Sequence, residues 1–426
     1  MAQYICTNCG EGSAGWIGKC PSCQEWNTFK VFKETPENRS KKIEPLSVKP
    51  LNKIKALETT RKSSGLSEFD RVLGGGIVAG EVLLLTGEPG IGKSTLLLQS
   101  LKNFKTLYIS GEESAPQVKD RADRLKINLD NFNFSDTLQV ESITNGILEM
   151  KSKPEIVVID SIQTIYSKEL ATIPGNVAQL RECTSKLIRV AKENSIPIII
   201  VGHITKDGDI AGPKTLEHMV DAVLVFEGDK ISNFRILRAQ KNRFGSTDEI
   251  GIFEMIDIGL SEISSPQAFI DNQHQEIVPG KATIGAMEGK RPLFFEIQSL
   301  ATPSFLPVPR RVIKGVDYNK VLLLVAVIEK HLKIPLLKYD IFVNVVGGVQ
   351  IKSPSADLGV VASIISSVKN LPLKETCIFT GEVGLLGEIR KSAGQEKILK
   401  EIARLNNHTS YSSLNLKNVK NLIDLF

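Results

Sequence analysis

This chain of 426 residues lacks the features of membrane, secreted and repeat proteins. It has no run of eighteen or more apolar residues, which excludes an ordinary membrane-spanning helix. Its first residues lack the basic segment followed by an apolar one that marks a secretory signal. No internal repeat is present. These absences predict a globular protein that stays in the cytoplasm without a membrane partner.

A strong charge imbalance is also absent. The 53 Lys and Arg residues against 48 Asp and Glu residues give a net charge of +5, which permits a polyanionic partner without requiring one. Hydrophobic residues make up 42% of the chain and charged residues 24%, as is usual for a globular protein. At about 150 residues per domain, the length predicts two or three domains.

Cysteine is scarce except near the N-terminus, where four of the six cysteines lie within 23 residues. The spacing is C-x-x-C, ten residues, then C-x-x-C, and it involves Cys6, Cys9, Cys20 and Cys23. Two such pairs can place four thiolates tetrahedrally around one Zn²⁺. A redox dithiol is the alternative, but neither pair has the strand–helix surroundings of one. We therefore predict a zinc-binding module over residues 1–30.

Both tryptophans of the chain, Trp16 and Trp26, lie in this module and are expected to cover its small core. Residues 31–62 follow, with many lysines and arginines, three prolines and few large apolar side chains. This composition predicts a basic, flexible linker.

Residues 63–270 alternate short, branched apolar runs with helical patterns. Such runs are typical of strands buried on both faces of a parallel sheet. The runs are 82–85, 106–109, 156–159, 198–201 and 223–226, and the helices are predicted at 94–101 and 177–193. This pattern predicts an α/β nucleotide-binding domain.

A phosphate-binding loop follows the first of these runs and opens the first helix. Its residues fit G-x-x-x-x-G-K-[ST]: Gly87, Glu88, Pro89, Gly90, Ile91, Gly92, Lys93 and Ser94. The glycines let backbone N–H groups and the helix N-terminus face the phosphates of ATP. Lys93 is predicted to contact the β- and γ-phosphates and Ser94 to ligate Mg²⁺, with Thr95 nearby.

Three further strand ends carry polar candidates. Asp160 ends the third run, where a carboxylate can hold the Mg²⁺ shell. Glu112 and Glu113 follow the second run; we favour Glu112 for orienting the attacking water and keep Glu113, or a plain acidic helix cap, as alternatives. His203 follows the fourth run and either senses the γ-phosphate or is structural.

Residues 271–426 predict an α+β domain. Strands are predicted at 282–286, 293–297 and 342–346, and helices at 319–331, 355–367 and 395–405.

Four stretches, taken together, resemble the bacterial RadA (Sms) DNA-repair family, whose core is RecA-like. They are Cys6–Cys23 followed by Trp26-Asn27-Thr28, the phosphate-binding loop, Lys241-Asn242-Arg243-Phe244-Gly245, and Pro354-Ser355-Ala356-Asp357-Leu358. The resemblance covers nearly the whole chain. It implies a DNA-dependent ATPase of recombinational repair, a hexameric motor on single-stranded and branched DNA that promotes branch migration with RecA.

The same resemblance implies that Lys241 and Arg243 reach the ATP of a neighbouring subunit, against the alternative of an exposed basic turn. It also implies DNA-contacting loops at Thr164–Gln179 and Lys206–Lys214, in which Lys168, Lys206 and Lys214 could bind phosphates. Ordinary solvated loops are the alternative there.

The C-terminal domain resembles the proteolytic domain of Lon, which uses a Ser–Lys dyad. Ser355 falls at the nucleophile position, but the lysine position reads Glu396, with Lys397 one residue beyond. One residue on a helix is a rotation of about 100°, so we expect a non-proteolytic scaffold, with Arg310, Arg311 and Lys314 as a basic cluster. A Lon-type serine protease and a RecA-like ATPase without a DNA track remain the alternatives.

Overall fold

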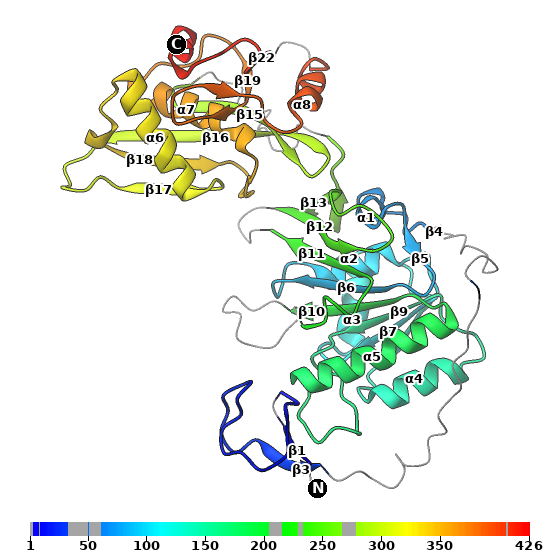
Figure 1. Ribbon diagram of the computed structural model, residues 1–426. Coiled ribbons are helices and arrows are strands. Elements are labelled where there is room, and N and C mark those ends of the chain that lie inside the picture. The colour runs from blue at the N-terminus through cyan, green and yellow to red at the C-terminus, as the bar shows by residue number, and fades with distance from the viewer. Residues whose placement is uncertain are drawn as a thin grey trace. The chain divides into compact units, whose positions relative to one another are not determined.

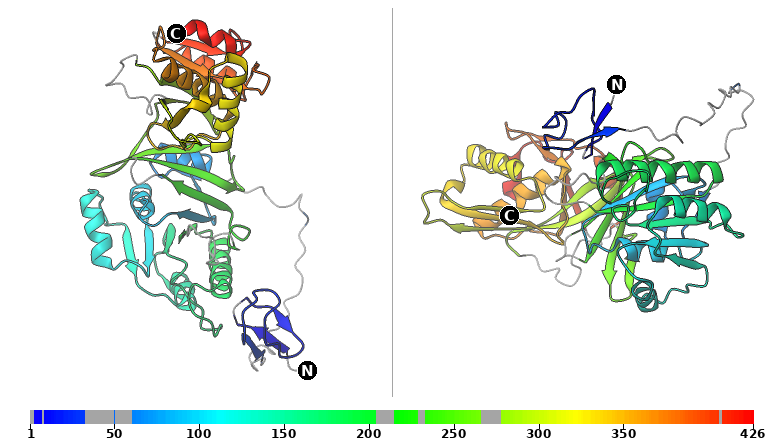
Figure 2. Two further views of the ribbon diagram at one scale, coloured as in Figure 1. Left: turned by 90° about the vertical axis from the view of Figure 1, so that its left-hand side faces the viewer. Right: turned by 90° about the horizontal axis from the view of Figure 1, so that it is seen from below.

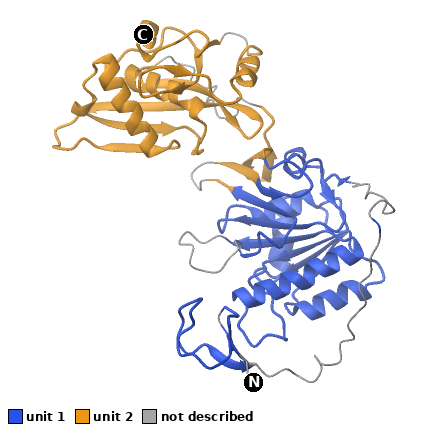
Figure 3. Ribbon diagram, viewed as in Figure 1, with its two compact units in different colours: residues 1–226, 239–247 blue, residues 227–238, 248–426 orange. Residues whose placement is uncertain are grey.

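The computed structural model describes most of the chain. The described residues are 3–7, 9–32, 50, 61–203, 215–228, 233–265, 278–405 and 408–426. Most of the linker predicted at 31–62, and the domain boundary predicted at residue 270, lie outside them and stay predictions. Within these ranges, every helix is too short or too polar to span a bilayer. The chain divides into two compact units, residues 1–226 with 239–247 and residues 227–238 with 248–426 (Figure 3).

The N-terminal module is a three-stranded antiparallel sheet in the order β2-β1-β3. Its strands are β1 (Gln3–Cys6), β2 (Gly12–Ser13) and β3 (Phe29–Phe32). Cys6, Cys20 and Phe29 form its buried cluster. Trp16 and Trp26 are 58% and 67% exposed, so the expectation that they cover the core was wrong. The side chains packed against the buried cluster are those of Tyr4, Cys9 and Cys23.

The core of the first unit is a parallel sheet in the order β11-β6-β10-β9-β7-β8. Its strands are β6 (Val82–Gly87), β7 (Thr106–Ser110), β8 (Phe132–Ser135), β9 (Ile156–Asp160), β10 (Ile198–His203) and β11 (Ala222–Glu227). Every residue of β6, β7 and β9 is buried. The five strands predicted from apolar runs are confirmed, and the fold is the RecA-like α/β fold expected.

The helix α1 (Ser67–Leu73) precedes β6, and the successive strands from β6 to β10 are connected by α2 (Lys93–Ser100), α3 (Ala115–Arg124), α4 (Val140–Glu149) and α5 (Val177–Asn194). Figure 1 shows α4 and α5 side by side on one face of the sheet. The helix α5 begins where the Asn176 side chain accepts a hydrogen bond from the N–H of Ala178. It buries an apolar stripe that includes Leu180, Cys183 and Leu187, as an amphipathic helix on a sheet should. The helices α2 and α5 confirm the two predicted here.

The second unit begins with antiparallel strands and continues into an α+β domain. The first strands are β12 (Phe234–Asn242), whose residues 239–242 belong to the first unit, β13 (Ile250–Ile256) and β14 (Gly259–Glu262). A six-stranded sheet follows in the order β17-β18-β16-β15-β19-β22. Its strands are β15 (Lys281–Glu288), β16 (Arg291–Pro303), β17 (Arg311–Lys314), β18 (Tyr339–Val345), β19 (Cys377–Thr380) and β22 (Thr409–Ser412).

The helices α6 (Tyr318–Leu332) and α7 (Asp357–Lys369) pack against each other and belong to the core of this domain, and α8 (Gln395–Ile402) follows (Figures 1 and 2). The helix predicted from residue 355 instead begins with a 3-10 turn, Pro354–Ala356, and becomes α-helical at Asp357. Proline is tolerated in such a first turn because it needs no N–H donor there. The α+β expectation is confirmed.

Candidate functional site

The polar candidates of the first unit meet at one edge of its parallel sheet. The strands β6, β7, β9 and β10 run in the same direction, so their carboxyl ends lie together. Ligands of open α/β sheets bind at this edge. The phosphate-binding loop, Glu112, Asp160 and His203 all lie at or directly after these strand ends.

The phosphate-binding loop needs its glycines. Gly90 and Gly92 have φ values of +79° and +111°, where side chains with a Cβ are strained. A Cβ on Gly87 would lie 2.5 Å from the carbonyl oxygen of Phe226. These glycines allow the chain to turn tightly between β6 and α2, which begins at Lys93.

Lys93 lies at the centre of this loop. Its Nζ donates to the carbonyl oxygens of Gly87 (2.9 Å) and Glu88 (3.1 Å) and lies 3.2 Å from Nδ1 of His203. Burial lowers the pKa of its ammonium group, while the charges of Asp160 and Glu112 act in the opposite direction. A buried cation facing a glycine-rich loop is suited to a phosphate.

Asp160 is buried beside Ser94. Its Oδ2 accepts hydrogen bonds from Ser94 Oγ (3.0 Å) and from the hydroxyl of Tyr108 (2.5 Å). Burial raises the pKa of the carboxyl group, and a bound cation would favour its ionised form. The hydroxyl and carboxylate oxygens are the hard donors that Mg²⁺ prefers, so this pair fits the ion. Tyr108 was missed because it lies in a strand where nothing in the sequence separates it from a core residue.

Glu112 and Glu113 have different partners. Glu112 accepts from Ser161 Oγ through Oε1, and its Oε2 lies 3.0 Å from Nε2 of His203. The hydrogen bond with His203 lowers the pKa of Glu112 against the opposing effect of burial. Glu113 instead pairs with the guanidinium of Arg121 on α3. This geometry favours Glu112 over Glu113 for contact with a bound nucleotide.

The structure brings Glu112, Asp160 and His203 close together: one ligand atom from each lies within 4.8 Å of the others. Thr95 is half-buried on α2 next to Ser94. Lys93, Ser94 and Glu112 therefore share one site with Asp160 and His203, as the order of motifs predicts.

Lys241 and Arg243 lie at and after the end of β12 and differ in exposure. The ammonium of Lys241 donates to the carbonyl oxygens of Glu217 (2.8 Å), His218 (3.3 Å) and Val220 (2.8 Å). The side chain of Arg243 is 56% exposed and contacts the buried carboxylate of Asp221 at 3.3 Å. Lys241 holds the turn at residues 217–220, whereas the Arg243 side chain is accessible to solvent.

The predicted DNA loops are only partly described. Lys206 and Lys214 lie outside the described residues. Lys168 is exposed in a segment held by the buried amide of Gln179, which donates to the carbonyl oxygens of residues 167, 170 and 172. The loop after β9 is therefore anchored at its base, and its basic side chain faces solvent.

The four N-terminal cysteines fit one zinc ion. One sulfur from each lies within 4.8 Å of the others. The Sγ atoms of Cys6 and Cys23 are 3.6 Å apart, and those of Cys9 and Cys20 are 3.5 Å apart. Tetrahedral ligation with Zn–S bonds of about 2.3 Å gives sulfur separations of about 3.8 Å. The module is a four-cysteine zinc ribbon.

Ser355, which falls at the nucleophile position of the Lon resemblance, lies in the second unit. Its side chain is fully buried, and its Oγ is 2.8 Å from Ser353 Oγ. The side chain of Glu396 is 78% exposed and pairs with Lys391 at 2.6 Å; Lys397 is also exposed. The described contacts of Ser355 include no amine, so they give no dyad.

Two residues of the predicted basic cluster, Arg310 and Arg311, bind acceptors within their own domain. Arg310 pairs with Asp340 through Nε at 3.0 Å. The guanidinium of Arg311 donates to backbone oxygens, among them that of Leu336 at 3.1 Å. Of the three residues predicted, Lys314 alone lines an open groove.

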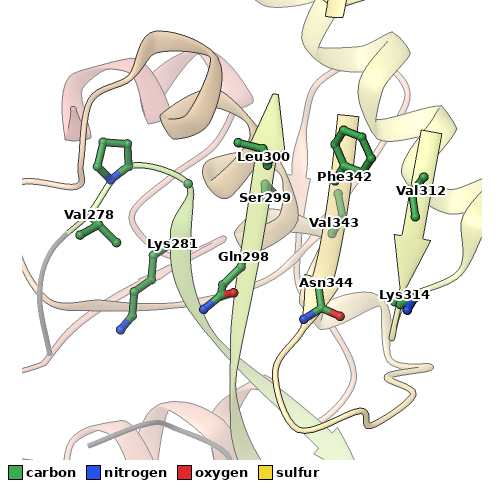
Figure 4. A pocket seen from close by; sticks show the side chains of 12 residues that line it. Val278, Lys281, Gln298, Ser299, Leu300, Val312, Lys314, Phe342, Val343 and Asn344 are labelled. Atoms are coloured by element: carbon green, nitrogen blue, oxygen red, sulfur yellow. The ribbon is translucent and has the colours of Figure 1, made fainter. Parts of the chain in front are cut away.

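That groove has a volume of about 600 Å³ and lies on the six-stranded sheet. Lys281, Gln298, Asn344 and Lys314 are successive cross-strand neighbours on β15, β16, β18 and β17. Figure 4 shows these four side chains in one row, with an apolar row of Leu300, Phe342 and Val312 beside it.

Comparisons with known proteins agree with this geometry. A family model described as the KaiC ATPase matches residues 62–153, and a rubredoxin metal binding domain matches residues 4–30. The DNA repair protein RadA of Bacillus subtilis (strain 168) is 46% identical over 416 residues, which cover 95% of this chain and 90% of that protein. The DNA repair protein RadA of Escherichia coli (strain K12) is 42% identical over 410 residues, covering 93% and 89%.

Among solved structures, the crystal structure of the RadB recombinase is similar to 47% of this chain and 99% of its own chain. The TM-score is 0.39 and the sequence identity is 23%.

Proposed function

This chain belongs to the RadA family of DNA repair ATPases, and from that premise we propose that it is a DNA-dependent ATPase that drives branch migration. It would act on single-stranded and branched DNA in the cytoplasm, together with the recombinase RecA, as a homo-oligomeric ring, the hexamer that the family resemblance implies. The observation that carries the proposal is the convergence of Lys93, Ser94, Asp160 and Glu112 on one edge of the sheet.

Each residue of this site would have a separate role in ATP hydrolysis. Lys93 would bind the β- and γ-phosphates in place of the loop carbonyls that it contacts here. Ser94 and Asp160 would hold Mg²⁺, which neutralises charge on phosphate oxygens when bound. Glu112, whose pKa is lowered by His203, stays ionised and accepts a hydrogen bond from the attacking water. This orients the water toward the γ-phosphate.

Arg243 would act on the ATP of a neighbouring subunit. Its guanidinium is more than half exposed, and an arginine supplied in trans stabilises the charge of the transferring phosphoryl group. Lys241 would assist there after releasing the turn at residues 217–220. A ring of identical chains places each Arg243 at the next nucleotide site.

Mixing two inactive variants tests this trans role. Arg243→Ala should bind ATP normally and hydrolyse it at least about 100-fold more slowly, because the arginine contacts only the transition state. Lys93→Ala should be inactive because it lacks the ammonium group that binds the β- and γ-phosphates. Mixed rings pair an intact Lys93 with an intact Arg243 at some interfaces, so phosphate release should reappear on mixing. Hydrolysis by Arg243→Ala at the parental rate would overturn the trans role.

DNA would contact the loop that carries Lys168 and the groove on the C-terminal sheet (Figure 4). Lys281 and Lys314 lie at the two ends of its polar row, although Lys281 also pairs with Glu296 at 3.0 Å. Phosphate contacts of this kind weaken as salt rises. A three-strand branch-migration assay with ATP or a non-hydrolysable analogue tests the motor. ATP hydrolysis that ignores single-stranded DNA would favour an ATPase without a DNA track.

A further inference from the structure

Ser161 is a buried polar residue at the nucleotide site to which the sequence patterns assign no role. It directly follows Asp160, and its side chain is fully buried. Its hydroxyl donates to Oε1 of Glu112. Glu112 precedes it by 49 positions, so no local motif links the two.

This hydrogen bond restricts a side-chain torsion of Glu112 that has no strong preference of its own. The Glu112 side chain is 37% exposed, and the last torsion of a glutamate side chain is broad and roughly two-fold. Two hydrogen bonds restrict that torsion here, one to each oxygen: Ser161 holds Oε1 and His203 holds Oε2. Removing either one would let the carboxylate rotate.

Two hydrogen bonds hold the backbone carbonyl groups of Asp160 and Ser161, one of them from the segment that carries Glu112. Thr164 Oγ1 donates to the Ser161 carbonyl oxygen at 2.8 Å, and the Gly111 N–H donates to the Asp160 carbonyl oxygen at 3.0 Å. A Cβ on Gly111 would lie 2.3 Å from Thr164 Oγ1. A side chain at residue 111 would therefore force Thr164 and Leu138 to shift, and with Thr164 the hydrogen bond to the Ser161 carbonyl oxygen.

We infer that Ser161 is a positioning residue for ATP hydrolysis: its hydroxyl orients Glu112 so that the carboxylate directs water at the γ-phosphate. This inference rests on the proposed ATPase function and adds a residue to its machinery. Ser161 touches no reacting atom and acts through Glu112.

The test is a double-mutant comparison in the full-length chain with zinc bound. Ser161→Ala should lower kcat about 10- to 100-fold, the range that small misplacements of a catalytic group produce. ATP affinity should stay at the parental value, since the Ser161 hydroxyl is already engaged with Glu112. In a Glu112→Gln background the same substitution should change kcat less than two-fold, because the group that it positions is already lost.

A matched control separates positioning from general loss of structure. Ser100→Ala also removes a fully buried serine hydroxyl, but that hydroxyl donates to a helix carbonyl at Leu97, and kcat should be unchanged. Equal losses for Ser161→Ala in both backgrounds, or parental kcat for Ser161→Ala, would overturn the inference. A parent chain that releases phosphate no faster than Lys93→Ala would instead overturn the proposed function on which it rests.

Discussion

The carboxyl edge of the parallel sheet in the first unit and the segment around Ser355 in the second unit both place polar side chains in buried surroundings. In the first, Lys93, Asp160, Glu112 and His203 come from separate strand ends, and each contacts another polar group of the site. In the second, Ser355 contacts Ser353. The charged group nearest in sequence, Asp357, pairs with Lys320 at 2.9 Å and accepts from the Val383 N–H.

The difference teaches that burial and perturbed pKa values do not by themselves mark a catalytic site. Burial raises the pKa of Asp357 to about 6 even though Lys320 opposes the shift. Its contacts tie the start of α7 to α6 and β20 (Glu382–Val383). In the candidate nucleotide site, by contrast, complementary groups contact one another beside a glycine-rich loop. Chemistry needs that convergence, and the variants below probe it.

The largest effect is expected from Lys93→Ala. Loss of the buried ammonium removes the main positive charge facing the phosphates, so ATP hydrolysis should fall by about 1000-fold or more. Phosphate release by the purified chain measures it. Lys102→Ala, an exposed lysine just after the same helix, is the matched control and should retain the parental rate. A Lys93→Ala variant with parental turnover would show that this edge is no catalytic site.

The two neighbouring glutamates should differ. Glu112→Gln should slow hydrolysis about 100-fold or more while ATP binding persists, because the oriented carboxylate is lost. Glu113→Gln should cost less than about ten-fold, since its carboxylate serves the Arg121 pair. Single-turnover phosphate release and nucleotide titration separate the two quantities. The reverse order of effects would assign the water to Glu113.

Lys320→Met should affect stability and leave hydrolysis unchanged. It deprives the buried Asp357 carboxylate of its cation, a loss of about 1–3 kcal/mol after discounting for the partial exposure of Lys320. Urea unfolding measures this loss, with Lys330→Met on the exposed face of the same helix as control.

The pH dependence of that loss has a definite sign. The folded pKa of Asp357, about 6, lies above its ordinary value of 3.8, so protonation favours the folded state. The ionised carboxyl group therefore destabilises the fold at pH 7, and this destabilisation is relieved as pH falls from 6 toward 3.8. Lys320→Met should raise the folded pKa of Asp357 further. The difference in the free energy of unfolding between the parent and the variant should therefore become smaller as pH falls from 7 to 5. A gap that widens would contradict the buried-pair interpretation.

The smallest effect is expected from Ser355→Ala. Its buried hydroxyl contacts Ser353, so ATP hydrolysis should stay within two-fold of the parental rate. Neither the parent nor the variant should degrade casein. Casein degradation that disappears in Ser355→Ala would restore the Lon-type protease alternative and remove the contrast between the two regions.

Much of the nucleotide site was predictable because its signals are local. The phosphate-binding loop, Asp160 at a strand end and the C-x-x-C pairs are short patterns whose geometry follows from a few neighbouring residues. The apolar runs predicted the strands because a buried parallel strand excludes polar side chains on both faces. Tyr108 was not predicted because its hydroxyl donates to Asp160 on the neighbouring strand β9. No spacing in the sequence indicates that contact.

The sequence by itself therefore determined five strands of the parallel sheet, the helices α2 and α5, the four cysteines of the zinc ribbon and the place of the glycine-rich loop between β6 and α2, but not α1, α3, α4 or the strands β12 to β14. The tertiary structure alone decided that Glu112 rather than Glu113 lies beside His203, that Ser161 and His203 hold the two oxygens of Glu112, and that Lys241 is bound to the turn at residues 217–220. The physical reason is register: Ser110 pairs with Asp160 across β7 and β9. That alignment brings together Glu112 and Ser161, which are 49 positions apart, and the pairing of β9 with β10, in which Ile159 lies opposite Ile200, adds His203, 91 positions from Glu112.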